Sequence, residues 1–116
     1  TNNGTAIGSS FTLTGKRLLV RWDFSCNTSV ANQQYTMELN IATSLTATPL
    51  TVNSGSKTIP FYVNYAQMHY TIPPIIYSVA SGYSSGTYNA YVRLLSNTNF
   101  VSDASDPYVL SIQELP

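Results

Sequence analysis

The chain has few charged residues and no run of positive charge. Asp, Glu, Lys and Arg make up 9 % of its 116 residues, and the formal net charge is zero. Soluble domains usually contain about 25 % charged residues, so most of the polar surface must come from uncharged side chains. Lys16, Arg17 and Arg21 are the only positive cluster. Because nucleic-acid binding needs several basic side chains on one face, no nucleic-acid partner is predicted.

The sequence also lacks the features of several other protein classes. Cys26 is the only cysteine, which excludes a module held by internal disulfides, and we expect it to fill space in the core. No apolar run is long enough to span a membrane, so membrane insertion is not predicted. The five carboxylates form no recognisable catalytic pair, and no phosphate loop or nucleophile motif occurs. We therefore predict a protein that is not an enzyme and uses no cofactor.

Small polar residues and tyrosine replace the missing charge. The chain contains 15 Ser, 14 Thr, 10 Asn and 9 Tyr. Thr and Tyr favour strands, whereas Asn and Ser favour turns. A hydrophobic content of 43 % argues against disorder. The composition therefore indicates a folded all-β protein.

Alternation of apolar and polar residues predicts short strands along the whole chain. The strongest pattern runs from Lys16 to Cys26, where Leu18, Val20, Trp22 and Phe24 share one face. The other strands are predicted over residues 11–15, 35–42, 58–72, 75–80, 87–95 and 108–115, with an edge strand or loop over 43–52. Eight or nine short strands at this spacing indicate a β-sandwich or barrel.

Breaks between these strands follow from turn-forming residues. Residues 53–57, Asn-Ser-Gly-Ser-Lys, are predicted to form a turn. Pro73 and Pro74 are predicted to interrupt the strand pattern. The first ten residues are predicted to be a linker or a weak edge strand.

Several strands carry apolar or aromatic residues on both faces. Tyr91 and Leu95 lie on the face opposite Tyr88 and Val92. The outer face of an isolated sandwich is usually polar. We therefore expect a second buried surface, such as an interface in an oligomer.

The two terminal strands resemble a known family. Residues 86–93, Gly-Thr-Tyr-Asn-Ala-Tyr-Val-Arg, and residues 110–115, Leu-Ser-Ile-Gln-Glu-Leu, resemble the last two strands of trimeric jelly-roll heads related to tumour necrosis factor and the complement-type globular heads. The likeness is greatest to heads at the C-terminal tips of phage tail fibres, head fibres and spikes.

The resemblance implies a specific architecture. It predicts an all-β jelly-roll β-sandwich of about eight to ten short antiparallel strands over residues 11–116, with residues 1–10 as a linker or shaft remnant. Its final strand would lie centrally in the inner sheet, near the axis of a homotrimer. The predicted trimer-interface residues are Tyr88, Tyr91, Leu110 and Ile112.

Aromatic and amide side chains in the polar loops are the candidate ligand-binding residues. A tyrosine ring can stack on a sugar face, and amide or carboxylate groups can bind its hydroxyls. The predicted ligand-binding residues are Tyr83, Asn32, Asn97, Asn99 and Asp103, with Tyr83 as the exposed aromatic. The other tyrosines are predicted to lie in the core or in an interface.

No metal site is predicted. Asp103 and Asp106 could bind calcium, but capping of turns explains them better. His69 could bind a transition metal on a three-fold axis, but a hydrogen-bonded strand histidine explains it better. Arg21 and Asp23 are predicted to take part in a charge pair between neighbouring strands. That pair could include Glu38.

These features together predict a non-enzymatic, trimeric head domain of a viral, phage-type fibre or spike. It would lie on the virion surface, outside the cell, and bind a host receptor such as a glycan. One alternative is a structural domain that trimerises or caps a fibre, or decorates a capsid, without a receptor site. Another is a monomeric carbohydrate-binding module. That module should present a flat strip of Trp and Tyr, which the inward position predicted for Trp22 does not favour.

Overall fold

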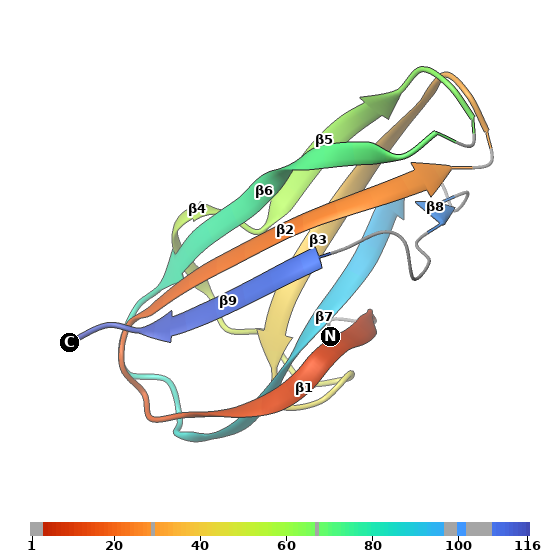
Figure 1. Cartoon of the computed structure of the whole chain (residues 1–116). Helices are drawn as coiled ribbons and strands as arrows, with labels where there is room; N and C mark the ends of the chain where they lie inside the picture. The colour runs from red at the N-terminus through yellow and green to blue at the C-terminus, as the bar shows by residue number, and fades with distance from the viewer. Residues whose placement is uncertain (1–3, 29, 67, 97–99, 102–107) are drawn as a thin grey trace.

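Two antiparallel β-sheets pack face to face in a computed structural model of the chain (Figure 1). The structure describes residues 4–28, 30–66, 68–96, 100–101 and 108–116. The strands are β1 (Thr5–Leu13), β2 (Leu18–Thr28), β3 (Gln33–Ala42), β4 (Val52–Ser56), β5 (Thr58–Val63), β6 (Tyr70–Val79), β7 (Gly86–Ser96), β8 (Phe100–Val101) and β9 (Tyr108–Glu114). Sheet A has the order β1-β7-β3-β5. Sheet B has the order β4-β6-β2, with β8 and β9 also paired to β2.

Successive strands alternate between the two sheets. Strands β1, β3, β5 and β7 belong to sheet A, whereas β2, β4 and β6 belong to sheet B. The chain therefore passes from one sheet to the other at each of these connections. The all-β sandwich predicted from the strand pattern is confirmed.

The last strand, β9, lies at the edge of sheet B. It pairs with β2 from Leu18 to Phe24, and no other described strand pairs with it. The central position implied by the family resemblance is therefore wrong for this chain. Polar contacts hold its end: Leu115 N donates to Arg17 O at 2.8 Å, and Thr14 N donates to Glu114 Oε1 at 2.6 Å.

The first strand, β1, is longer than predicted. Residues 5–10 belong to it, so the linker expected over residues 1–10 does not extend past residue 4. It pairs with β7, but the register shifts between Ile7 and Phe11. Gly8 adopts a φ of 71° inside this irregularity, a left-handed conformation that glycine tolerates. The alternative prediction of an edge strand fits residues 5–10.

Two predicted breaks are strands instead. Strand β6 continues through Pro73 and Pro74, which lie in a bulge where the register with β2 shifts between Trp22 and Phe24. A bulge leaves residues out of the ladder, so the missing proline N–H groups cost little there. Residues 53–56, predicted as a turn, form most of β4, which pairs with β6 at the sheet edge.

The core contains the apolar faces predicted from the sequence. Leu18, Val20, Trp22 and Phe24 are buried, and Cys26 lies fully inside. The Trp22 and Phe24 rings stack with centroids 4.1 Å apart. From the other sheet, Met37, Leu39 and Ile41 complete the same cluster.

A buried hydrogen bond joins the two sheets. Tyr77 Oη of β6 donates to Leu39 O of β3 at 3.0 Å. Burial raises the pKa of the Tyr77 phenol well above its ordinary value, and the negative charge of Glu38 acts in the same direction. The phenol therefore stays protonated and keeps its donor through neutral and moderately alkaline pH.

The central strand β3 is buried on both faces within a single chain. Besides its core face, Glu38, Asn40 and Ala42 are buried on the outer face of sheet A. On the neighbouring β7, Tyr91 is only 7 % exposed. Part of the two-faced pattern is thus explained without an oligomer.

Candidate functional site

Tyr83 does not present an exposed ring. Its side chain is half-buried and packs against the core cluster. The ring meets Tyr88 edge-on, with centroids 6.0 Å apart. Burial raises the pKa of its phenol, and the charge of Glu114 adds to this effect. The prediction of Tyr83 as the exposed aromatic is therefore wrong, because the 81–85 connection turns the ring toward the core.

Of the other predicted ligand-binding residues, the structure describes only Asn32. Asn32 is exposed in the turn between β2 and β3, with a φ of 56°. Asparagine tolerates this left-handed conformation better than most residues. Asn97, Asn99 and Asp103 lie outside the described residues, as does Asp106.

The predicted interface residues are mostly internal. Tyr88 and Tyr91 are buried within the chain. Leu110 and Ile112 are half-buried and pack against the core. The structure therefore leaves Tyr88 and Tyr91 little surface to offer a neighbouring subunit.

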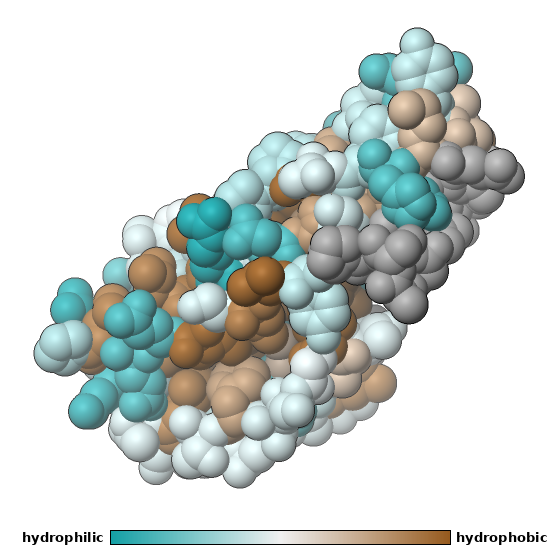
Figure 2. Space-filling view, in the orientation of Figure 1, coloured by the Kyte–Doolittle hydropathy of each residue, from teal (hydrophilic) through white to brown (hydrophobic). Residues whose placement is uncertain are grey.

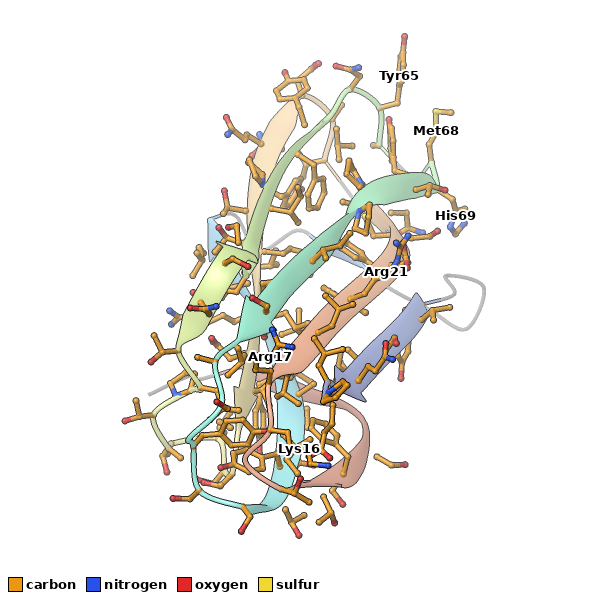
Figure 3. All side chains as sticks on the ribbon, turned by 90° about the vertical axis from the view of Figure 1, so that its left-hand side faces the viewer. Lys16, Arg17, Arg21, Tyr65, Met68 and His69 are labelled. Atoms are coloured by element: carbon orange, nitrogen blue, oxygen red, sulfur yellow. The ribbon has the colours of Figure 1, made fainter. Side chains whose placement is uncertain are left out.

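Exposed aromatic and apolar side chains gather at one end of the sandwich. We call this the loop end; it comprises the described residues of the β2–β3 and β5–β6 connections. Gln33 pairs with Val63 and Cys26 pairs with Tyr70, so the two connections lie side by side. Tyr65 is 64 % exposed, and Met68 and Val30 of the same connections are exposed, as is Tyr62 near the end of β5. Tyr65, Met68 and His69 project from this end in Figure 3.

The loop carrying Tyr65 is held by a second tyrosine. Tyr70 Oη accepts a hydrogen bond from Tyr65 N at 2.9 Å and donates to Tyr65 O at 3.3 Å. Both backbone groups of Tyr65 are thereby fixed, while its ring stays in solvent. The sequence could not separate Tyr65 from the strand tyrosines, since the whole 58–72 stretch has an apolar and aromatic pattern.

Charged residues form two separate clusters on the outer faces of the sheets. Arg21 binds Asp23 through two hydrogen bonds of 2.8 and 3.1 Å on sheet B. The hydrogen bond from the Arg21 guanidinium lowers the pKa of the Asp23 carboxyl. The prediction that Arg21 and Asp23 take part in an ion pair is confirmed, but its expected position between two strands is wrong, because both residues belong to β2. Glu38 is not part of it.

Glu38 belongs to a half-buried network on sheet A. Its Oε1 accepts hydrogen bonds from Arg93 Nε and Asn40 Nδ2, each at 2.7 Å. Lys57 Nζ donates to Asn40 Oδ1 at 2.8 Å and lies 3.9 Å from Glu38 Oε2. Burial of Glu38 opposes ionisation, but these hydrogen bonds and positive charges outweigh it, so the pKa of the carboxyl is lowered.

The outer face of sheet B carries exposed apolar side chains. Leu19, Ile76 and Val109 come from three neighbouring strands, and Val109 is 62 % exposed. Arg21 pairs in register with Ile76, and Asp23 pairs with Val109. The two charges at the centre of this face therefore neutralise each other. We call these five residues the sheet B face.

A cavity opens between the edge strands β1 and β9. It has a volume of about 550 Å³. Figure 2 shows apolar surface between these two strands. Ile7 and Phe11 of β1 and Leu110 and Ile112 of β9 are half-buried. A second hollow of about 320 Å³ continues along β1 and β9 past Tyr108, which lines both. A side chain at Gly8 would come within 4.0 Å of Tyr108 Oη, so this tyrosine reaches from β9 toward β1.

The described residues contain no cluster of His, Cys, Asp or Glu that could hold a metal ion. They also contain no helix long and apolar enough to cross a membrane.

Compared with known proteins, the chain matches no family model, no curated protein and no solved structure. The fold, the surfaces described above and the resemblance of the terminal strands are therefore the basis for a functional proposal.

Proposed function

We propose that the chain is a non-enzymatic attachment domain, the head of a viral fibre or spike, and that its loop end binds a glycan on a host surface. The observation that carries the proposal is Tyr65. Its ring is exposed while the Tyr70 hydroxyl holds its backbone. The resemblance of the terminal strands to fibre heads supports the viral setting.

The loop end has the chemistry that sugar recognition needs. A tyrosine ring offers an apolar face to the C–H groups of a pyranose and a hydroxyl to its polar edge. Fixing the loop before binding reduces the conformational entropy lost on association. The exposed Asn32 lies at the same end and can exchange hydrogen bonds with sugar hydroxyls. Among the predicted ligand-binding residues, Asn32 thus supports a site at the loop end.

We expect Tyr65→Ala to weaken binding about tenfold, because tyrosines that anchor an interface typically contribute more than 1 kcal/mol. The wild-type chain is first applied to an array of neutral and acidic glycans. The dissociation constants for the strongest glycan are then measured by calorimetry. Tyr70→Phe should cause a smaller loss, since it keeps the Tyr65 ring and removes only the hydroxyl that fixes it.

Leu45→Ala is the matched control, because Leu45 is an exposed apolar residue of the 43–51 connection. It should leave the dissociation constant unchanged. A glycan that binds wild type and Tyr65→Ala equally well would refute the loop-end site. Absence of any glycan binding would favour the alternative of a structural domain that trimerises or caps a fibre.

We further propose that three copies associate through the sheet B face. Leu19, Ile76 and Val109 provide apolar area around an ion pair that carries no net charge. A three-fold assembly would present three loop ends together, and weak individual sites would gain affinity through effective concentration.

Light scattering on a sizing column tests the assembly. We expect a mass near three times 12.7 kDa for the wild type. Val109→Asp should give the monomer, because it places an unpaired charge in the proposed interface. Leu45→Asp introduces the same charge elsewhere and should leave the mass unchanged. A wild-type monomer across micromolar concentrations would refute intrinsic trimerisation and favour the monomeric carbohydrate-binding module.

A further inference from the structure

We propose that the free edge of β9 binds an extended segment of a partner protein. The segment adds to sheet B as a strand antiparallel to β9 and places neutral, apolar side chains in the two hollows between β1 and β9. This partner is distinct from a glycan at the loop end and from the copies of the chain that meet at the sheet B face.

Alternate backbone groups of β9 point away from β2. Leu115 N donates to Arg17 O at 2.8 Å, and the register of β9 with β2 then continues without a shift. In an antiparallel ladder, residues bonded to the neighbouring strand alternate with residues whose N–H and C=O groups point the other way. Counting back from Leu115, the groups of Tyr108, Leu110 and Ile112 face the open edge. No described strand pairs with that edge (Figure 1).

Another strand is the ligand that fits this row of backbone groups. The N–H and C=O groups carry opposite partial charges, and they recur about every 7 Å along β9. An extended backbone presents the complementary row of acceptors and donors. The described pairings of sheet B are all antiparallel, and antiparallel pairing is slightly more stable than parallel pairing. The added strand is therefore assigned an antiparallel direction.

The other described sheet edges carry features that hinder strand addition, but β9 does not. The register of β1 with β7 is broken, and so is the register of β4 with β6. Strand β5 contains Pro60. Bulges and prolines protect edges against pairing with other chains. Strand β9 has seven residues without proline or glycine, and its one charged residue, Glu114, is bound to Thr14.

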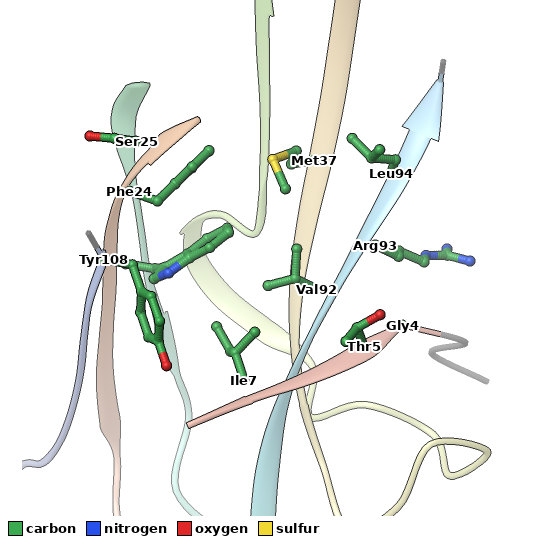
Figure 4. Close-up of a pocket in the computed structure, with 11 residues that line it drawn as sticks. Gly4, Thr5, Ile7, Phe24, Ser25, Met37, Val92, Arg93, Leu94 and Tyr108 are labelled. Carbon is green, nitrogen blue, oxygen red and sulfur yellow. The ribbon is translucent and has the colours of Figure 1, made fainter. Parts of the chain in front are cut away.

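The two hollows beside β9 fit the inward side chains of an added strand. Their volumes are about 550 and 320 Å³, whereas a cavity of about 150 Å³ already holds benzene. Figure 4 shows Ile7, Met37 and Val92 of sheet A lining the larger hollow, with Phe24 and Tyr108 of sheet B opposite. Side chains at every second position of a strand lie on one face. The partner segment should thus have apolar residues at alternate positions.

The lining also argues against a charged side chain in either hollow. Arg93 is the only ionised residue among the described residues that line them. Its guanidinium is hydrogen-bonded to Glu38, and Figure 4 shows its side chain directed away from the larger hollow. An unpaired charge is costly to bury. The inward residues of the partner are therefore neutral.

Peptides with N-methyl groups at chosen positions test the proposal on the full chain. The probes are acetylated heptapeptide amides with Thr or Ser at odd positions and Val, Leu, Ile or Phe at the three even positions. In an antiparallel pairing, the even residues lie opposite Tyr108, Leu110 and Ile112 and direct their N–H groups to β9. N-methylation of two even residues of the strongest peptide should weaken binding at least about tenfold, because hydrogen bonds are lost. N-methylation of two odd residues is the matched control and should change the dissociation constant by less than about twofold.

The backbone amides of β9 report where the peptide binds. In ¹H–¹⁵N NMR spectra, the amide protons of Leu110 and Ile112 should move downfield when the peptide is added, because they gain an acceptor. The amide protons of Ser111 and Gln113 already bond to β2 and should move much less. The even-methylated peptide should cause neither change.

Substitutions separate the β9 edge from other surfaces. Leu110→Pro removes an N–H group that faces the open edge, where proline is tolerated. It should weaken the peptide about tenfold more than Leu110→Ala, which also loses the leucine side chain. Ile7→Phe fills part of the larger hollow and should weaken the peptide, whereas Leu45→Phe should not. Ile7→Phe keeps the proposal testable if Leu110→Pro does not fold.

Three results would overturn the proposal. Equal effects of even and odd N-methylation would mean that the peptide does not pair with β9 as an antiparallel strand. Absence of binding by every peptide up to its solubility limit would mean that the edge accepts no such segment. In the third result, no peptide binds and Val109→Asp chains still associate unless Leu110→Pro is added, which would assign the edge to a second copy of the chain. None of these results bears on glycan binding by Tyr65, so the two proposals can fail separately.

Discussion

Replacing Glu38 by alanine is expected to lower the free energy of unfolding by about 3 kcal/mol at pH 7. Glu38 Oε1 accepts hydrogen bonds from Arg93 and Asn40, and Lys57 is close to Oε2. The substitution removes the only carboxylate in this network and leaves two positive groups in a half-buried setting. Urea unfolding followed by far-UV circular dichroism would measure the change.

The effect of Glu38 should depend on pH. Its pKa is lower in the folded chain than the unfolded value of about 4.3. A carboxyl group whose pKa is lowered by folding stabilises the folded chain fully at pH values above its pKa in the unfolded chain. This stabilisation is lost as the pH falls through its pKa in the folded chain. The stability difference between wild type and Glu38→Gln should therefore shrink between pH 6 and pH 3. A difference that stays constant over this range would contradict the linkage.

The Arg21–Asp23 pair supplies the control. This pair is bidentate, but both side chains are well exposed. Exposed ion pairs contribute little, because water already solvates the separated charges. Asp23→Ala should hence change the stability much less than Glu38→Ala. If both substitutions had the same effect, burial of the Glu38 network would not be the cause.

The core was predictable because strand alternation is a local signal. Leu18, Val20 and Trp22 recur with a period of two, and each is buried in the structure. The burial of Glu38 and Asn40 was not predictable from the same signal. Both lie on the outer face of β3, and their burial depends on residues far away in the chain. Arg93 is 55 residues from Glu38, and the sequence alone cannot say that the two strands are neighbours.

The errors in the strand boundaries have a similar origin. Pro73 and Pro74 remove two hydrogen-bond donors, which normally ends a strand. The sequence does not show that Asp23 on β2 lies opposite both residues, which places them in a bulge. Likewise, the sequence does not reveal the different environments of Tyr83 and Tyr65. Only the tertiary structure places Tyr83 against Tyr88 and leaves Tyr65 in solvent.

Gly55→Ala is expected to lower the free energy of unfolding by about 3 kcal/mol. Gly55 lies in β4 with a φ of 83°, a conformation that strains any residue with a Cβ atom. An added Cβ would also lie 2.5 Å from Ile76 O and 2.9 Å from Tyr77 Cα. Both atoms belong to the backbone of β6, which cannot rotate away as a side chain could. The clash therefore acts directly on the β4–β6 ladder.

Gly82→Ala separates the two causes of this effect. Gly82 also has a positive φ, 107°, but an added Cβ would meet no described atom within 4 Å. Its substitution should cost only the conformational strain, about 1 kcal/mol. Thermal unfolding should show a clearly larger fall in Tm for Gly55→Ala, and hydrogen exchange should become faster in β4 and at its partners in β6. Equal losses for the two glycines would mean that the backbone of β4 is not held against β6 as closely as the structure places it. A larger loss at Gly55 would instead show that edge strand β4 depends on the absence of a single methyl group.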